Sequence, residues 1–101
     1  MQRKVFRTKL RPERRDEYID AHNNFSPELL KLYKEAGLKV CAVYLLDDDL
    51  VLVIESDNHE RVCEVLLNNP LDQKWQSYVR PMKAEGDWQE MREIFAADLS
   101  M

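Results

Sequence analysis

The chain has 101 residues, of which 45% are hydrophobic and 34% charged, with two glycines and four prolines. This composition excludes a collagen-like, mucin-like or generally disordered chain, and the length suits one domain with one core. The longest apolar run, Val40 to Leu46, has seven residues, whereas crossing a bilayer requires roughly 20. We therefore expect a single domain over residues 1–101 and no membrane partner.

Two features of the sequence bear on its compartment. The N-terminus is basic but has no apolar stretch behind it, so a cleaved signal peptide is not expected. Cys41 lies in a strand pattern and Cys63 in a helix pattern, which makes a poor disulfide scaffold. Free thiols are the simpler interpretation, and they favour a cytoplasmic protein.

The net charge of −4 conceals a basic N-terminal segment. The first 15 residues carry seven Lys or Arg and one Glu, whereas the remaining 86 carry eight basic and 18 acidic residues. Such a segment could contact phosphate. However, Val5, Phe6 and Leu10 interrupt it at strand-like positions. We interpret it as the solvated face of a strand and expect no nucleic-acid partner.

The first part of the chain predicts a strand followed by two helices. Residues 4–10 alternate loosely, and Pro12 ends this strand. From Pro12 the apolar spacing becomes helical. Ser26 and Pro27 then restart a helix as its N-cap and first helical residue, and Gly37 stops it.

The next part predicts a β-hairpin. Two apolar runs, residues 38–46 and 50–55, are joined by three aspartates that have the composition of a turn. Both faces of both strands are apolar, although a sheet with helices on one side and water on the other should alternate. No remaining segment can cover the second face, so we expect a second copy of the chain to do so in a C₂ homodimer.

The last part predicts two helices and a strand. Ser56 and Asp57 are expected to cap a helix that runs to about Asn69, and Pro70 restarts a shorter helix that ends near Pro81. Residues 88–97 suit a final strand. The order strand, helix pair, strand, strand, helix pair, strand is that of an α+β, ferredoxin-like split βαβ fold.

Few residues can carry chemistry. The histidines and cysteines are too scattered for a metal site, and the sequence has neither a glycine-rich phosphate loop nor a serine nucleophile elbow. Tyr18 and His22, however, lie four residues apart on one face of a helix. Histidine can donate and accept a proton at neutral pH, although a half-buried aromatic residue packed against a capped histidine near a helix end is the plainer alternative. We expect no metal and no cofactor.

The other histidine and the tryptophans have ordinary explanations. His59 stands between Asp57 and Glu60 at a helix start, which is typical of a solvated surface residue. Trp75 and Trp88 suit core positions, although a flat indole also binds the apolar side of a sugar ring.

The sequence resembles the L-rhamnose mutarotase family over nearly its whole length. No single tripeptide carries the resemblance, which rests on the order and spacing of several stretches. These stretches are Arg3–Phe6, Pro12, Glu17–Tyr18, His22–Asn23, Pro27–Leu29, Ala36–Gly37, Ala42–Leu45, Gln73–Trp75, Tyr78 and Met91–Phe95.

The resemblance implies a dimeric α+β barrel built from ferredoxin-like subunits. It also implies an enzyme that interconverts the anomers of a 6-deoxy-hexose, with L-rhamnose as the first choice of substrate. The family's proton donor falls on His22, and its sugar-contacting tyrosine on the same helix falls on Tyr18. The first of its paired tryptophans falls on Trp75.

Several positions depart from the family pattern. Gln76 stands where the family commonly has a second tryptophan, and Cys41 stands where it has a sugar-contacting tyrosine on the second strand. Ser26 replaces a usual tryptophan, and residues 83–87 form a shorter loop than many members carry. Tyr44 is not expected to replace the missing tyrosine, because positions 41 and 44 face opposite sides of a strand unless a bulge intervenes. The departures change the sugar cradle more than the proton transfer.

The expected reaction is the ring opening of a hemiacetal, rotation about one bond and reclosure. It needs a proton delivered to the ring oxygen while the anomeric hydroxyl loses one. His22 would be the general acid, whereas the opposing base, a carboxylate or a water, is not identified. Three alternatives stay open: a mutarotase for another sugar such as L-fucose, a non-catalytic sugar-binding relative, and a cofactor-free monooxygenase on the same dimeric barrel.

Overall fold

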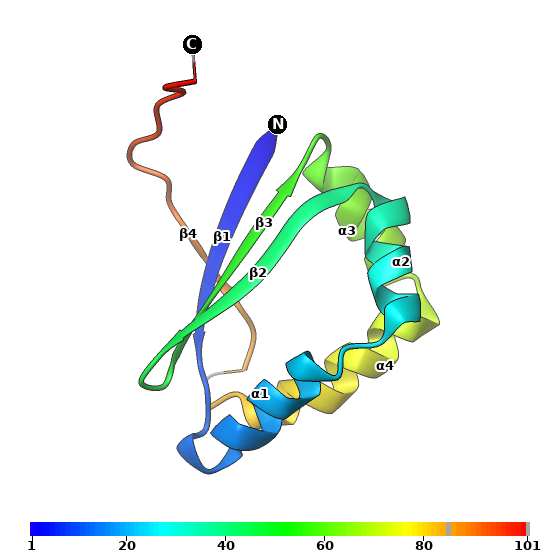
Figure 1. Ribbon diagram of the computed structural model, residues 1–101, viewed down its shortest axis with the longest axis vertical. Coiled ribbons are helices and arrows are strands. Elements are labelled where there is room, and N and C mark those ends of the chain that lie inside the picture. The colour runs from blue at the N-terminus through cyan, green and yellow to red at the C-terminus, as the bar shows by residue number, and fades with distance from the viewer. Residues whose placement is uncertain (85, 101) are drawn as a thin grey trace.

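The computed structural model describes residues 1–84 and 86–100, which form one sheet covered on one side by helices (Figure 1). Within these residues the sheet has four antiparallel strands in the order β2-β3-β1-β4. This is the predicted ferredoxin-like α+β arrangement. The elements in chain order are β1 (Gln2–Lys9), α1 (Arg15–Asn23), α2 (Pro27–Ala36), β2 (Leu38–Leu46), β3 (Asp49–Ser56), α3 (His59–Leu67), α4 (Pro70–Val79) and β4 (Gln89–Met91), with short 3₁₀ helices at Pro12–Arg14 and Arg80–Met82.

Helix α2 begins and ends as its sequence predicts. The hydroxyl of Ser26 accepts a hydrogen bond from the backbone N–H of Leu29 at 3.3 Å, and Pro27 occupies the first turn. Gly37 ends the helix with φ +107°, a left-handed conformation that side chains with a Cβ rarely adopt. Its N–H is 3.1 Å from the carbonyl oxygen of Lys34.

The prediction for the start of α3 is wrong. The N-cap is Asn58, whose side-chain oxygen accepts a hydrogen bond from the backbone N–H of Arg61 at 3.1 Å. Ser56 is still part of β3, where it is buried and paired with Gln2 of β1. The side chain of Asp57 forms an ion pair with Lys39 at 2.8 Å instead of capping the helix.

The prediction of a strand over residues 88–97 is correct only in its first part. Strand β4 covers three residues and pairs with Val5–Arg7 of β1. Residues 92–100 extend away from the body, and Ile94 and Phe95 are more than 80% exposed (Figure 1). Residues 92–97 form no strand in the structure, so the alternating pattern predicts a longer strand than is present.

A small core lies at one end of the molecule. It consists of Leu10, Tyr18, Leu50, Val79 and Met82, which come from β1's end, α1, β3, α4 and the turn after α4. Elsewhere, a cleft separates much of the helical layer from the sheet. None of the helices in residues 1–84 and 86–100 has the length and apolar character needed to cross a bilayer.

The strand register assigns the two faces of the hairpin. Cys41, Val43 and Leu45 pair with Ile54, Leu52 and Leu50, and all six side chains line the cleft on the helix side. The residues between them lie on the opposite face. Tyr44 is 61% exposed there and does not line the cleft, as the period-2 argument predicts.

Candidate functional site

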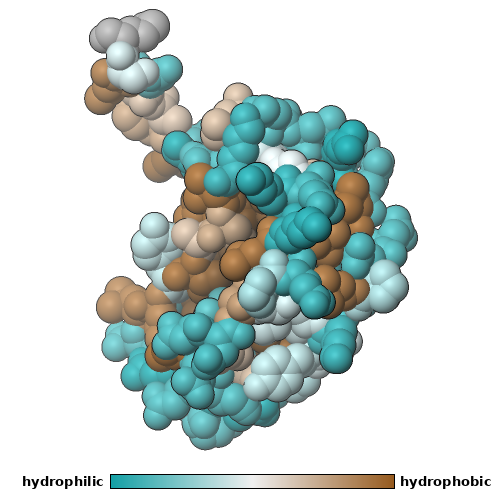
Figure 2. Space-filling view, turned by 45° about the vertical axis from the view of Figure 1, so that its right-hand side comes forward, coloured by the Kyte–Doolittle hydropathy of each residue, from teal (hydrophilic) through white to brown (hydrophobic). Residues whose placement is uncertain are grey.

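The helix side of the sheet and the four helices enclose a cleft of about 900 Å³. Apolar side chains gather across the middle of the face shown in Figure 2, between polar rims. All five residues expected from the sequence to form a site line this cleft: Tyr18, His22, Cys41, Trp75 and Gln76.

His22 lies near the end of α1, with its imidazole fixed at one nitrogen. Nδ1 is 2.8 Å from the carbonyl oxygen of Tyr18. Since a carbonyl oxygen only accepts, Nδ1 carries the hydrogen and Nε2 is the nitrogen left to exchange a proton. Burial lowers the pKa of His22, and the charge of Lys83 lowers it further, against the opposing effect of the Tyr18 carbonyl.

Aromatic rings surround the imidazole. The ring centre of Tyr18 is 4.4 Å from that of the imidazole, and Trp75 of α4 meets the imidazole edge-on with 5.1 Å between ring centres. Phe25, from the link between α1 and α2, packs edge-on against Trp75 at 4.7 Å and lies 6.1 Å from His22. These rings pack around His22 and form an aromatic wall of the cleft. Gln76 follows Trp75 at the same wall of the cleft.

Tyr18 belongs both to the buried core and to the cleft lining, and it is 4% exposed. Burial raises its pKa to about 12, so the phenol keeps its proton and can donate a hydrogen bond at neutral pH.

A hydrogen-bonded pair that the sequence did not reveal lies beside Cys41. The hydroxyl of Tyr33 on α2 donates to Oδ1 of Asp72 on α4 at 2.7 Å, and Asp72 is 7% exposed. Burial, and then the Asp72 carboxylate, raises the pKa of Tyr33. Burial also raises the pKa of the Cys41 thiol, with a further contribution from Asp72. The sequence does not single out Asp72, because an acidic residue in the first turn of a helix is already explained by its favourable interaction with the helix dipole.

Lys83 is the second residue that sequence reasoning missed. It is 4% exposed and lines the cleft, with Nζ 4.5 Å from the ring centre of Trp88. Burial, and then the charge of Arg80, lowers the pKa of Lys83 to about 8, against an opposing effect of Asp87. Trp88 also lines the cleft, so neither residue is an ordinary surface group.

His59 is not the solvated surface residue that its acidic neighbours suggested. His59 is the first residue of α3, and its ring centre lies 6.3 Å from that of Phe6 on β1. Its side chain lines the cleft. Its Nε2 is 3.4 Å from Sγ of Cys63. Within the part of the chain that the structure describes, no group of three His, Cys, Asp or Glu side chains is arranged to hold a metal ion.

Fold and cleft together define a small ferredoxin-like α+β protein whose candidate site combines an ionisable histidine with an aromatic wall. A family profile for L-rhamnose mutarotase matches residues 3–97. The chain belongs to this family, whose members are enzymes that interconvert sugar anomers.

Individual relatives agree with this assignment. An L-rhamnose mutarotase of Sinorhizobium fredii is 32% identical over 83 residues, which cover 78% of this chain and 77% of that protein. The crystal structure of L-rhamnose mutarotase FA22100 from Formosa agariphila superposes with a TM-score of 0.81 at 19% identity, over 97% of this chain and all of the other. Tetracenomycin F2 cyclase of Streptomyces glaucescens shares the fold at a TM-score of 0.71 and 19% identity, with both chains fully covered.

Proposed function

We propose that the protein interconverts the α and β anomers of a 6-deoxy-hexose, with L-rhamnose as the first candidate, and that His22 is the proton donor. The observation that carries the proposal is the imidazole of His22, held through Nδ1 by the Tyr18 carbonyl and walled by aromatic rings inside the cleft. Membership of the mutarotase family supports the reaction class.

In this mechanism the imidazolium Nε2–H of His22 protonates the ring oxygen as the bond from that oxygen to the anomeric carbon breaks. The anomeric hydroxyl loses its proton to a second group, and a carbonyl forms at the anomeric carbon. After rotation about the adjacent carbon–carbon bond, the same transfers run backwards and close the ring. A positioned acid or base of this kind contributes roughly 10²–10⁴-fold to a rate.

The remaining expected residues bind the sugar. The indole of Trp75 would pack on the apolar side of the ring, next to the imidazole that it meets edge-on. Tyr18 would donate a hydrogen bond from a phenol that stays neutral at physiological pH. Cys41 and Gln76 line the same cleft and would contact the sugar from β2 and α4.

The direct test is saturation-transfer NMR between the two anomeric protons of L-rhamnose, with L-fucose and other 6-deoxy sugars in parallel. Native protein should accelerate the exchange for at least one sugar, and His22→Ala should abolish the acceleration. Asp20→Ala, an exposed change on the same helix, is the matched control and should retain it. Binding without acceleration by the native protein would favour a non-catalytic sugar-binding relative.

We also propose that the working form is a cytoplasmic homodimer, in which the sheets of two copies pack face to face. Apolar side chains on the sheet face away from the helices support the dimer, with Val40, Tyr44 and Leu46 between 39% and 74% exposed. Two thiols that form no disulfide with one another are compatible with a reducing compartment.

A further inference from the structure

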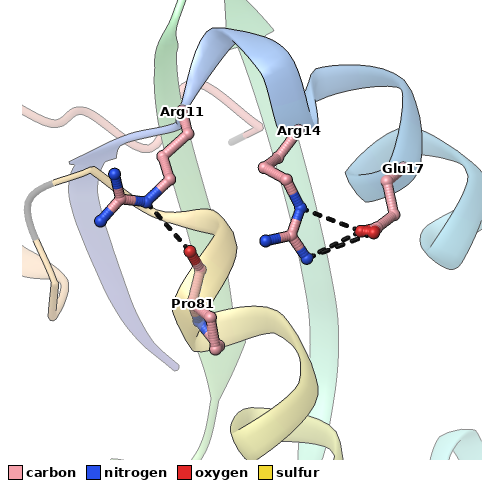
Figure 3. A network of polar contacts seen from close by, with 4 residues as sticks. All are labelled: Arg11, Arg14, Glu17 and Pro81. Atoms are coloured by element: carbon pink, nitrogen blue, oxygen red, sulfur yellow. Dashed lines mark hydrogen bonds and ion pairs between the residues drawn. The ribbon is translucent and has the colours of Figure 1, made fainter.

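The backbone around Lys83 is fixed against the end of β1. Lys83 forms an isolated antiparallel bridge with Leu10, and the N–H of Ala84 donates to the carbonyl oxygen of Lys9 at 2.7 Å. Arg11 donates to this turn twice, from its backbone N–H to Met82 at 2.8 Å and from Nε to Pro81 at 3.1 Å (Figure 3).

The same contacts set the position of α1 relative to Lys83. Arg11 leads directly into the 3₁₀ helix that precedes α1. The guanidinium of Arg14 donates hydrogen bonds of 2.7–3.2 Å to the carboxylate of Glu17 in the first turn of α1 (Figure 3). His22 lies one and a half turns further along this helix. Thus Arg11 bonds to the turn that carries Lys83 and also begins the segment that leads into the helix that carries His22.

A lysine buried to this extent is unusual unless a carboxylate pairs with it. Among the described residues, no carboxylate forms an ion pair with Lys83; Asp87, the nearest acidic influence, is itself paired with Arg80 at 3.5 Å. The charged groups that act on Lys83 are Arg80 and Asp87, and Lys83 in turn acts on His22. The ammonium lies over Trp88 in the cleft that His22 also lines, and its charge lowers the pKa of the imidazole.

We propose that Lys83 is the second proton-transfer group of the site, the counterpart that the reaction needs opposite His22. This inference rests on the mutarotase function proposed above. It adds to that function a residue that neither the sequence pattern nor the resemblance indicated.

The step balances with one proton shared by the pair. His22 in its protonated form gives the Nε2 proton to the ring oxygen, the bond between that oxygen and the anomeric carbon breaks, and Lys83 in its neutral form removes the proton of the anomeric hydroxyl. The pair has then exchanged its proton from one member to the other, and ring closure restores it. No oxidant, reductant or other co-reactant is needed.

The electrostatics of the cleft suit this sharing. The pKa of Lys83 is about 8 and that of His22 lies below its usual 6.5. Between these values the pair holds one proton, mainly on Lys83, and the minor form with the proton on His22 and a neutral Lys83 is the form that opens the ring. The rate should therefore follow a bell-shaped pH profile with its upper limb near pH 8.

The experiment measures anomer exchange of L-rhamnose from pH 5 to 9.5 in native protein, Lys83→Met, Lys83→Arg and the exposed control Lys34→Met. Native protein and Lys34→Met should give the full bell. Lys83→Met should lose about 10²-fold or more in rate. Lys83→Arg should lose as much, because a guanidinium keeps its proton throughout this range, although it preserves the cation over Trp88. NMR titration of the His22 ring should show a higher pKa in Lys83→Met, since a repelling charge is gone.

The outcomes separate the two proposals. If native protein exchanges no 6-deoxy sugar, the proposed function fails and this inference fails with it. If native protein is active but Lys83→Arg keeps its rate and pH profile, Lys83 has an electrostatic or packing role and the inference alone is overturned. Should neither variant fold, NMR titration of the Lys83 side chain in native protein decides: saturating L-rhamnose should perturb a group titrating near pH 8, and an unperturbed titration would overturn the inference.

Discussion

At the scale of single residues, Tyr18 shows how one side chain can serve both core and site. Its ring is part of the buried cluster and packs at a tilt against the imidazole of His22, with 4.4 Å between ring centres, and the same side chain lines the cleft. We expect Tyr18→Phe to leave the ring packing intact and to remove one hydrogen bond worth about 0.5–1.5 kcal/mol, which lowers the exchange rate roughly 2- to 13-fold. Saturation-transfer NMR gives the rate, and thermal unfolding checks the fold. A loss as large as that of His22→Ala would mean that the phenol itself transfers the proton.

Lys83 should cost the protein stability. Its pKa falls from 10.5 to about 8 on folding, so the amine binds a proton more weakly in the native state than in the unfolded chain, and this difference lowers the free energy of unfolding. The penalty is complete below pH 8, shrinks as pH rises, and disappears above about pH 10.5. We expect Lys83→Met to raise the free energy of unfolding at pH 7 by up to about 3 kcal/mol, and to raise it less at pH 9.5. Urea unfolding at both pH values measures the difference. An equal effect at the two values would show that packing, rather than charge, sets it.

Asp72 and Lys83 show why the candidate site is only partly predictable from the sequence. Tyr18 and His22 follow from helical spacing, and Trp75, Gln76 and Cys41 from the resemblance. Asp72 and Lys83 belong to residue types that occur at helix starts and in loops for solvent-related reasons. Only tertiary packing buries them, and the chain's periodicity carries no record of that burial.

At the scale of elements, among the residues that the structure describes one hydrogen bond joins α2 to α4 across the cleft wall. The donor is the hydroxyl of Tyr33, and the acceptor is the carboxylate of Asp72, a residue that is 7% exposed. Tyr33→Phe leaves this buried carboxylate without its donor. We expect a loss of about 1–3 kcal/mol in the free energy of unfolding. Tyr78→Phe, on an exposed tyrosine of α4, is the control and should change it little.

The elements themselves were largely predictable where local chemistry specifies them. The cap of α2 by Ser26, its stop at Gly37 and the hairpin of β2 and β3 follow from residue type and spacing. The errors arose where competing partners decide. Asp57 pairs with Lys39 instead of capping α3, which leaves the cap to Asn58. The alternating pattern of residues 92–97 indicates which way successive side chains would face in a strand, but it does not say whether the backbone pairing of β4 continues that far, and the pairing does not.

At the scale of the whole molecule, the outer face of the sheet should hold two copies together. Val53 lies on this face between Val5 of β1 and Ala42 of β2. We expect native protein near 24 kDa, twice the 12.0 kDa of one chain, by light scattering. Val53→Asp should place a desolvated charge in the centre of the contact and yield monomer with the same far-UV circular dichroism. A native monomer at micromolar concentration would contradict the homodimer.

The cleft has a further consequence for how long the protein survives. It occupies the space between sheet and helices where a larger apolar core would otherwise form, so a sugar bound as proposed would add to the stability of the fold. A sugar at ten times its Kd adds about 1.4 kcal/mol to the free energy of unfolding. A shift of this size changes the unfolded fraction roughly tenfold, which is enough to alter proteolytic turnover. We expect cellular abundance of the protein to rise with its sugar without any change in synthesis, and pulse–chase decay with and without L-rhamnose measures this.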